Sequence, residues 1–149
     1  MRSIFESQTR NDIVGRINSL SAESKARWGK MSVGQMLRHC AACEEYYFGR
    51  VPIKRSFLGR LIGPMVIKGI LKDETKQLGK NAPTSATLKV TEPVRDIEEE
   101  KKKWIALIND YGAYDKDHLV HWFFGKMTKD QLGCFVYKHC DHHLRQFGA

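Results

Sequence analysis

Three histidines, far apart in the chain, have the type and spacing of ligands to a transition metal. His139 and His143 are four residues apart in a segment with helical periodicity, so their side chains project from one helix face, one turn above the other. Two imidazoles held in this way can bind a metal from a rigid base. His39 lies in a second segment of helical periodicity and offers a third ligand. We expect these three residues to bind one divalent metal ion.

The two histidines of the last segment replace apolar residues on the face that should point to the core. At helical spacing, the same stripe contains Leu132, Phe135, Val136 and Phe147. A histidine on such a face must find a polar partner or bear the cost of desolvation. A single buried histidine is usually hydrogen-bonded within the core, but one cation would satisfy the pair and His39 together. The pattern therefore favours a metal site over unrelated core histidines.

Three neutral histidines leave at least one coordination position open, as in catalytic zinc sites. A cation there would lower the pKa of bound water or ionise an incoming thiol. Two further residues, His121 and Glu44, are candidates for a general base or an outer partner of the ion. The ordinary alternative for Glu44 is a salt-bridged or partly exposed carboxylate. His142 is about 100° round the helix from His143, so we expect it to face solvent or a neighbouring helix.

The four cysteines, Cys40, Cys43, Cys134 and Cys140, are expected to be reduced thiols. The CxxC pair has no second CxxC that would complete a zinc ribbon, and it lies in a helical pattern rather than after a strand. Small buried apolar residues are the simpler interpretation for most of them. Cys43, four residues after His39, could add a fourth ligand. That would close the site and make it structural, and we rank this arrangement below an open site.

Length and composition describe one folded domain over residues 1–149. The chain has 42% hydrophobic and 28% charged residues, which is typical of a globular protein. The N-terminal residues lack the apolar stretch of a signal peptide, and no window has the length of a membrane span, so we expect a cytoplasmic protein. The net charge is +8, and the basic residues are scattered along the chain. Its densest run, 101–103, follows acidic residues 98–100 and indicates a solvated helix rather than a nucleic-acid surface.

Hydrophobic periodicity predicts four long helices, over residues 4–20, 32–48, 93–108 and 128–147. Capping boxes at Ser32 and Thr128 mark two of the starts, and Pro93 suits a first turn. A long crossover, 49–92, joins the second and third helices. Its apolar and basic first half is interrupted by Gly63-Pro64. A membrane-surface helix is one interpretation; a broken helix that covers the mouth of the bundle is the one we favour. Residues 111–127 should form a loop whose aromatic side chains either line a pocket or close one end of the bundle core.

Two stretches resemble motifs of the DinB-like (YfiT-type) metalloenzyme superfamily. The stretch WGKMSVGQMLRH, which ends at His39, resembles its second-helix signature, and HCDHHLRQ, which begins at His139, resembles its closing H-x-x-x-H-x-x-Q helix. The resemblance covers most of the chain and implies an all-α, four-helix up-down-down-up bundle. It also implies that His39, His139 and His143 bind zinc, nickel or another divalent ion. Characterised members of the superfamily are hydrolases or transferases that use low-molecular-weight thiols.

Three function classes follow from these observations. The first is a metal-dependent enzyme, a hydrolase or thiol transferase whose small-molecule substrate is anionic or a thiol. The second is a non-catalytic domain in which the ion pins the second and fourth helices together. The third is a basic binding module whose histidines are incidental. We expect neither a nucleic-acid nor a membrane partner, and a homodimer through a helix face is compatible with this kind of bundle.

Overall fold

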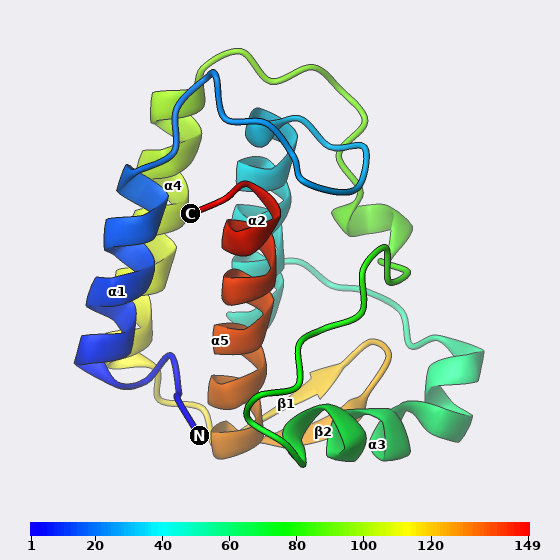
Figure 1. Ribbon diagram of the computed structural model, residues 1–149. Helices are drawn as coiled ribbons and strands as arrows, with labels where there is room; N and C mark the ends of the chain where they lie inside the picture. Colours follow the sequence, from blue (N-terminus) through cyan, green and yellow to red (C-terminus); the bar gives the residue numbers. More distant parts are fainter.

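The computed structural model describes all residues 1–149, and it is mostly helical (Figure 1). In chain order the elements are α1 (Ser7–Asn18), α2 (Val33–Tyr47), α3 (Phe57–Leu71), the 3-10 turn η1 (Ala86–Leu88), α4 (Ile97–Asp110), the 3-10 turn η2 (Tyr111–Ala113), β1 (His118–His121), β2 (Gly125–Thr128) and α5 (Lys129–Gln146). No helix is long and apolar enough to cross a membrane.

The helices α1, α2, α4 and α5 enclose the core. α4 packs against both α1 and α2, and α5 packs against α1 and α2. Figure 1 shows α1 and α5 running in one direction and α2 and α4 in the other. Their inward residues include Ile13, Met36, Trp104, Ile108 and Leu132, all fully buried. The apolar stripes predicted by periodicity thus face a common interior, and this positions the polar residues that share those stripes.

The helix starts predicted by capping boxes are confirmed, whereas the start predicted by proline is wrong. The side chains of Ser32 and Thr128 each accept a hydrogen bond from the backbone N–H of the glutamine three residues later. The side chain of that glutamine accepts one in turn from the backbone N–H of the capping residue. α4 instead begins at Ile97, with Asp96 accepting from the Glu99 N–H. A capping side chain accepts a hydrogen bond from a free N–H at the helix start and so specifies where the helix begins. Proline is only compatible with the first turn and specifies the boundary less well. The ends of α1 also lie inside the predicted 4–20.

The expected all-α class needs correction, because residues 118–128 form a small antiparallel hairpin rather than an irregular loop. His118 pairs with Thr128 and His121 with Gly125. Burial alternates along β2, with Gly125 and Met127 buried and Lys126 and Thr128 exposed, the two-residue period of a strand. Gly125 has φ +85°, a backbone conformation that glycine adopts at little cost. Four-residue strands are too short for this period to stand out in the sequence.

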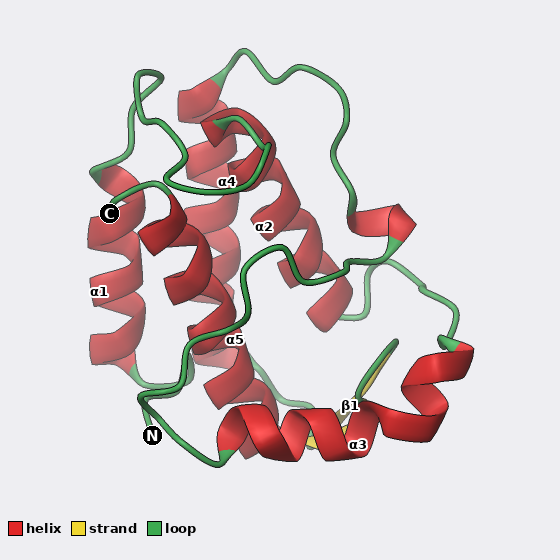
Figure 2. Cartoon of the chain, turned by 45° about the vertical axis from the view of Figure 1, so that its right-hand side comes forward, coloured by secondary structure: helices red, strands yellow, loops and turns green.

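The crossover contains an unbroken helix. α3 continues through Pro64, and the ribbon bends within it rather than ending (Figure 2). Proline removes one helical N–H and favours such a bend. α3 lies across the lower end of the molecule, against β2 and α5. The predicted break at Gly63-Pro64 is therefore wrong, although the segment does cover one end of the helices.

The rest of the crossover passes over α5 and reaches η1 beside α2 (Figure 2). The buried ammonium of Lys138 on α5 fixes its path by donating to three backbone carbonyls. These belong to Asp73, Glu74 and Lys76, at 2.9, 3.0 and 2.6 Å. One charged side chain thus holds a turn whose carbonyl groups would otherwise be hydrogen-bonded to solvent. The crossover continues from this turn towards the histidines.

Candidate metal centre

His39 projects from the middle of α2 and is only 5% exposed. Its Nδ1 lies 2.8 Å from the carbonyl oxygen of Leu88, the last residue of η1. A carbonyl can only accept, so Nδ1 carries the proton and donates it. The Nε2 atom of His39 therefore keeps its lone pair. Fixing the tautomer through the other ring nitrogen is what outer partners do for metal-binding histidines.

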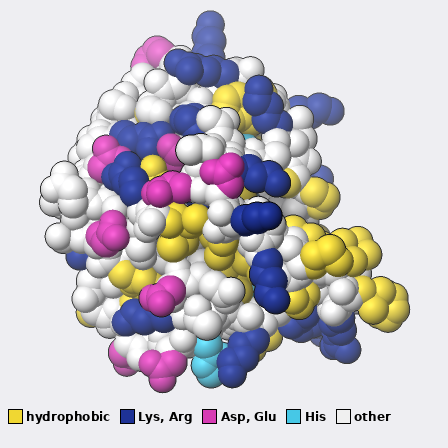
Figure 3. Space-filling view, turned by 60° about the horizontal axis from the view of Figure 1, so that its bottom comes forward, with side chains coloured by type: hydrophobic (Ala, Val, Ile, Leu, Met, Phe, Trp, Pro, Cys, Tyr) yellow, Lys and Arg dark blue, Asp and Glu magenta, His cyan; other side chains and the backbone are white.

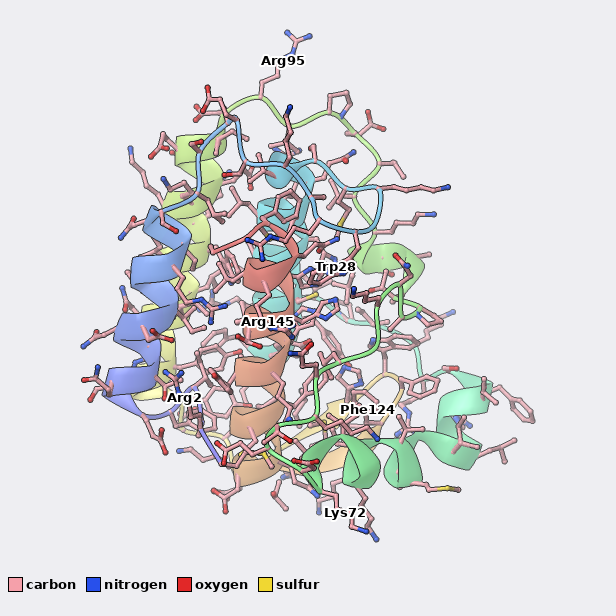
Figure 4. The ribbon with its side chains drawn as sticks, in the orientation of Figure 1. Arg2, Trp28, Lys72, Arg95, Phe124 and Arg145 are labelled. Carbon is pink, nitrogen blue, oxygen red and sulfur yellow. The ribbon has the colours of Figure 1, made fainter.

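His143 is oriented in the same way, through a chain of two hydrogen bonds. Its Nδ1 lies 2.9 Å from Oε1 of Gln146, and Nε2 of Gln146 donates to the carbonyl oxygen of Trp28 at 2.8 Å. Because the carbonyl of Trp28 fixes which end of the amide donates, Oε1 must accept from Nδ1–H of His143. Nε2 of His143 is therefore also left with a free lone pair. Figure 4 shows Trp28 beside the C-terminal half of α5.

His139 lies one turn before His143 on α5, and one of its ring nitrogens has no hydrogen-bond partner in the protein. Its Nδ1 is buried and has no hydrogen-bond partner. Buried polar atoms in folded proteins are nearly always paired, and one that is not asks for an explanation. A ligand in contact with the His139 ring would supply one.

The rings of the three predicted ligands lie close to one another. The ring centroid of His39 lies 5.7 Å from that of His139 and 5.0 Å from that of His143, and the His139–His143 distance is 4.7 Å. Residues a hundred positions apart in the chain thus surround one point between α2 and α5.

Cys43 joins this cluster, and the other cysteines do not. Potential ligand atoms of His39, Cys43 and His139 all lie within 4.8 Å of one another; His143 is outside this closest group. The Cys43 sulfur is 3.6 Å from Nε2 of His39. Cys40 instead contacts the sulfur of Met36 at 3.7 Å. The structure therefore offers two overlapping donor sets, three histidines or two histidines with a thiol, which share His39 and His139.

Burial keeps the imidazoles neutral, the form that binds metals. It lowers the pKa of His39, of His139 and of His143, in the last case to about 3. The neighbouring imidazoles lower the pKa of His139 and His143 further, because a second positive charge would be repelled. Burial raises the pKa of the Cys43 thiol, so without a cation this side chain is protonated.

Glu44, a candidate general base, lies on the other side of α2 and is fully buried. Its carboxylate accepts from Tyr111 Oη at 2.5 Å, Trp104 Nε1 at 3.4 Å and Cys140 Sγ at 3.5 Å. Burial raises its pKa to about 7, against the opposing effect of these three donors. The side chain thus joins α2, α4 and α5, and the structure does not bring it to the histidines.

His121, the other candidate, ends β1 and is likewise occupied. Its Nδ1 accepts from the backbone N–H groups of Phe123 and Phe124, both at 3.2 Å, and its ring stacks on Phe124 at 4.5 Å. Burial lowers its pKa to about 3, helped by the charge of Arg55. The ring of Tyr47 neighbours both His121 and His139, at 6.0 and 6.4 Å. His121 therefore shapes the hairpin turn next to the cluster.

The remaining histidines have opposite environments. His142 does not face solvent: it is 8% exposed, its ring lies 5.6 Å from that of Trp28, and its Nδ1 is buried without a partner. It packs against the loop before α2, which the sequence pattern gave no reason to place there. His118 is exposed on β1 and takes no part in the cluster.

Comparison with protein families gives one match. The family described as "Protein of unknown function (DUF1569)" matches residues 4–149. The chain belongs to this family. No curated protein and no solved structure matches it.

The structure adds two groups to the site of this DUF1569 protein that sequence reasoning missed, Gln146 and the carbonyl of Leu88. Gln146 stands in the H-x-x-x-H-x-x-Q stretch, and its position three residues after His143 could have indicated an orienting role. Nothing in the sequence could have indicated Leu88, because a backbone carbonyl has no residue-type signal and its place depends on the path of a long crossover.

Proposed function

We propose that this protein is a divalent-metal-dependent enzyme, a hydrolase or thiol transferase, with His39, His139 and His143 as its ligands. The observation that carries the proposal is the convergence of three neutral imidazoles, of which His39 and His143 are buried and His139 is partly exposed. Two of them have Nδ1 committed to Leu88 and Gln146, and the third has an orphaned nitrogen. A cluster that served packing alone would have its polar atoms paired with protein groups.

The helix directions support membership of the DinB-like superfamily. Up, down, down and up describe α1, α2, α4 and α5 as they run in Figure 1. The ligand positions on α2 and α5 also correspond to the two stretches that resemble the superfamily motifs. We propose zinc or nickel as the ion, since imidazole suits both.

The residues of the chain fit a bound ion and limit what reaches it. When bound, a divalent ion supplies Lewis acidity, which activates water or a low-molecular-weight thiol. His39 and His143 are buried, whereas His139 is partly exposed, so a small substrate would approach along the His139 side. The net charge of +8 favours an anionic substrate.

The direct test is a titration of metal-free protein with Zn²⁺ and Ni²⁺ by calorimetry. Wild type should bind one ion per chain. His39→Ala, His139→Ala and His143→Ala should each abolish stoichiometric binding, while the matched control His118→Ala, which removes an exposed histidine, should leave it unchanged. Wild type that binds no ion, or a triple His39/His139/His143→Ala variant that still binds one, would refute the proposal. Metal-dependent conjugation of a small thiol to an electrophile, absent in His139→Ala, would identify the transferase branch.

A second function is favoured by one specific contact, the approach of Cys43 to His39. If Cys43 were a fourth ligand in addition to the three histidines, four protein ligands would close the site and the ion would serve only stability. Replacing Cys43 by Ser separates the two functions. In an open three-histidine site the variant still binds one ion and the metal-free protein stays folded. In a closed site the variant loses affinity, and metal removal unfolds the wild type.

A further inference from the structure

α3 presents large apolar side chains to solvent. Phe57, Leu58, Leu61 and Met65 are 79%, 55%, 66% and 70% exposed. Positions 57, 61 and 65 follow one another at intervals of four, so they form one stripe along the helix. Figure 3 shows hydrophobic side chains projecting from one edge of the molecule, with Lys and Arg side chains beside them. A contiguous exposed apolar patch of this kind usually marks an interaction site.

The fold does not need this stripe. α3 is attached through its opposite face, where Gly59 and Gly63 lie against the backbone of Phe123 and Ile67 is buried. A Cβ atom at Gly59 or Gly63 would clash with the carbonyl group of Phe123, so these small residues allow the helix to approach the hairpin closely. The side chains on the outer face could therefore be polar without any loss of packing, and yet they are apolar.

The charged residues of α3 and of the segment just before it are all basic. Between positions 51 and 72 there is no acidic residue, and the basic residues are Lys54, Arg55, Arg60, Lys68 and Lys72; acidic residues resume at Asp73. Arg60, Lys68 and Lys72 are exposed on or next to α3 itself. An apolar stripe flanked by basic residues is the pattern of a helix that lies in a membrane interface, with its apolar face among acyl chains and its cations against anionic headgroups.

We propose that α3 binds the surface of a membrane that contains anionic lipids, with Phe57, Leu61 and Met65 inserted. The sequence left this interpretation open and favoured a helix that covers the bundle. α3 does cover one end of the helices, and its exposed stripe remains available to a further surface. α3 has 15 residues, which is about 22 Å of helix and too short to span a bilayer. The helix would therefore lie in the plane of the surface.

A second copy of the chain is the alternative occupant, and the charges disfavour it. In a two-fold symmetric contact the same patch meets itself. Pairing α3 with α3 would bring Arg60 and Lys68 of one chain close to the same cations of the other, without any acidic residue in the segment to offset them. Like charges at an interface oppose association, whereas an anionic lipid surface complements them.

Vesicle flotation tests the proposal with the full chain. Wild type should float with vesicles of phosphatidylcholine and phosphatidylglycerol in equal parts and remain unbound with phosphatidylcholine alone. The affinity of Leu61→Glu/Met65→Glu for the anionic vesicles should be lower by at least about tenfold, since two of the apolar side chains that insert into the membrane are replaced by charged ones. The control Ala22→Glu/Thr91→Glu adds the same charge on exposed loops at the opposite end of the molecule and should bind like wild type. Arg60→Glu/Lys68→Glu should be weakened and lose its preference for anionic lipid.

Several outcomes would overturn the proposal. These are a wild type that floats with neither vesicle, equal binding by the Leu61→Glu/Met65→Glu variant, or a wild-type dimer in light scattering that this variant converts to a monomer. The last result would assign the stripe to a second copy. Because the substituted side chains are exposed, the melting temperature should stay within a few degrees of wild type, which excludes unfolding as the cause of lost binding.

Discussion

Two polar clusters lie back to back in the interior of this protein, and they differ in whether their atoms are satisfied. Consecutive residues on the same helices build both: Cys43 and His139 point to one side, Glu44 and Cys140 to the other. Every donor that faces Glu44 comes from the protein, from three different helical segments. In the histidine cluster, by contrast, Nδ1 of His139 is buried without any partner.

This difference separates structural from ligand-binding roles among buried polar residues. A buried group whose polar atoms are all hydrogen-bonded to protein groups specifies how the elements pack. A buried group that is oriented by one hydrogen bond and keeps another polar atom unpaired is arranged to bind a ligand. By this criterion Glu44 holds the helices together, whereas the histidines are the candidates for binding a ligand, although sequence reasoning gave both a place in the site.

The largest expected effect comes from His139→Ala, because the two candidate donor sets share this residue. Loss of an outer partner of a metal site costs about 10–100-fold in affinity, so loss of a ligand should cost more than about a hundredfold. The stability of the metal-free protein should change by less than about 1 kcal/mol, since the ring has a buried unpaired nitrogen and its removal also relieves a desolvation cost. Calorimetry and urea unfolding measure the two quantities; a variant that binds metal like wild type would break the comparison.

Glu44→Ala should show the reverse pattern. Truncation leaves the Tyr111 hydroxyl and the Trp104 N–H buried without an acceptor and opens a cavity, a loss of about 3 kcal/mol in the free energy of unfolding. Metal affinity per folded molecule should remain within a few-fold of wild type. If the variant is too unstable to purify, Glu44→Gln, which keeps the volume and one acceptor, takes its place. Metal loss as complete as in His139→Ala would show that the two clusters are one.

The pH dependence of stability sharpens the assignment of Glu44. Burial raises its pKa from the ordinary 4.5 to about 7, so between these values the folded protein binds a proton that the unfolded chain has released. Stability from this group is therefore lost as pH rises from about 4.5 to about 7, by about 3 kcal/mol in total. Urea unfolding of metal-free wild type and Glu44→Gln should give a difference that changes with pH in this window and is flat above it. A flat difference throughout would contradict the raised pKa.

The smallest effect is expected from Gln146→Ala, which removes the partner that orients His143. Affinity for the ion should fall by about tenfold, the lower end of the range for outer partners, with stoichiometry unchanged. Gln146→Glu still accepts from Nδ1–H of His143 but cannot donate to the carbonyl of Trp28, so its affinity should lie between those of wild type and Gln146→Ala. An unchanged affinity in Gln146→Ala would mean that His143 is not a ligand and would favour the set with Cys43.

Local signals predicted those parts of the fold that local interactions determine. Capping boxes located the starts of α2 and α5, and the apolar stripes identified their buried faces, because both depend on residues within a few positions of each other. The proximity of His39 to His139 and His143 is expected from two distant stretches that resemble motifs of a single superfamily. The hairpin was missed because its strands are short, and Pro64 misled because proline bends a helix that tertiary contacts can still hold together.

The same distinction explains the errors in the site. Glu44 and His121 are chemically capable residue types near inward faces, but sequence periodicity cannot tell towards which neighbouring helix an inward side chain points. Leu88 became a partner of His39 only through the path of the crossover, which Lys138 fixes by contacts with backbone atoms. Information of that kind resides in tertiary structure.

We propose that His39, His139 and His143 surround a divalent ion. Crystals grown with Zn²⁺, with diffraction data collected on both sides of the zinc absorption edge, show whether they do. We expect one anomalous peak per chain, about 2.0–2.1 Å from Nε2 of His39, Nε2 of His143 and a ring nitrogen of His139. A difference map without a peak among the three rings, or with zinc only at surface groups such as His118, would contradict it.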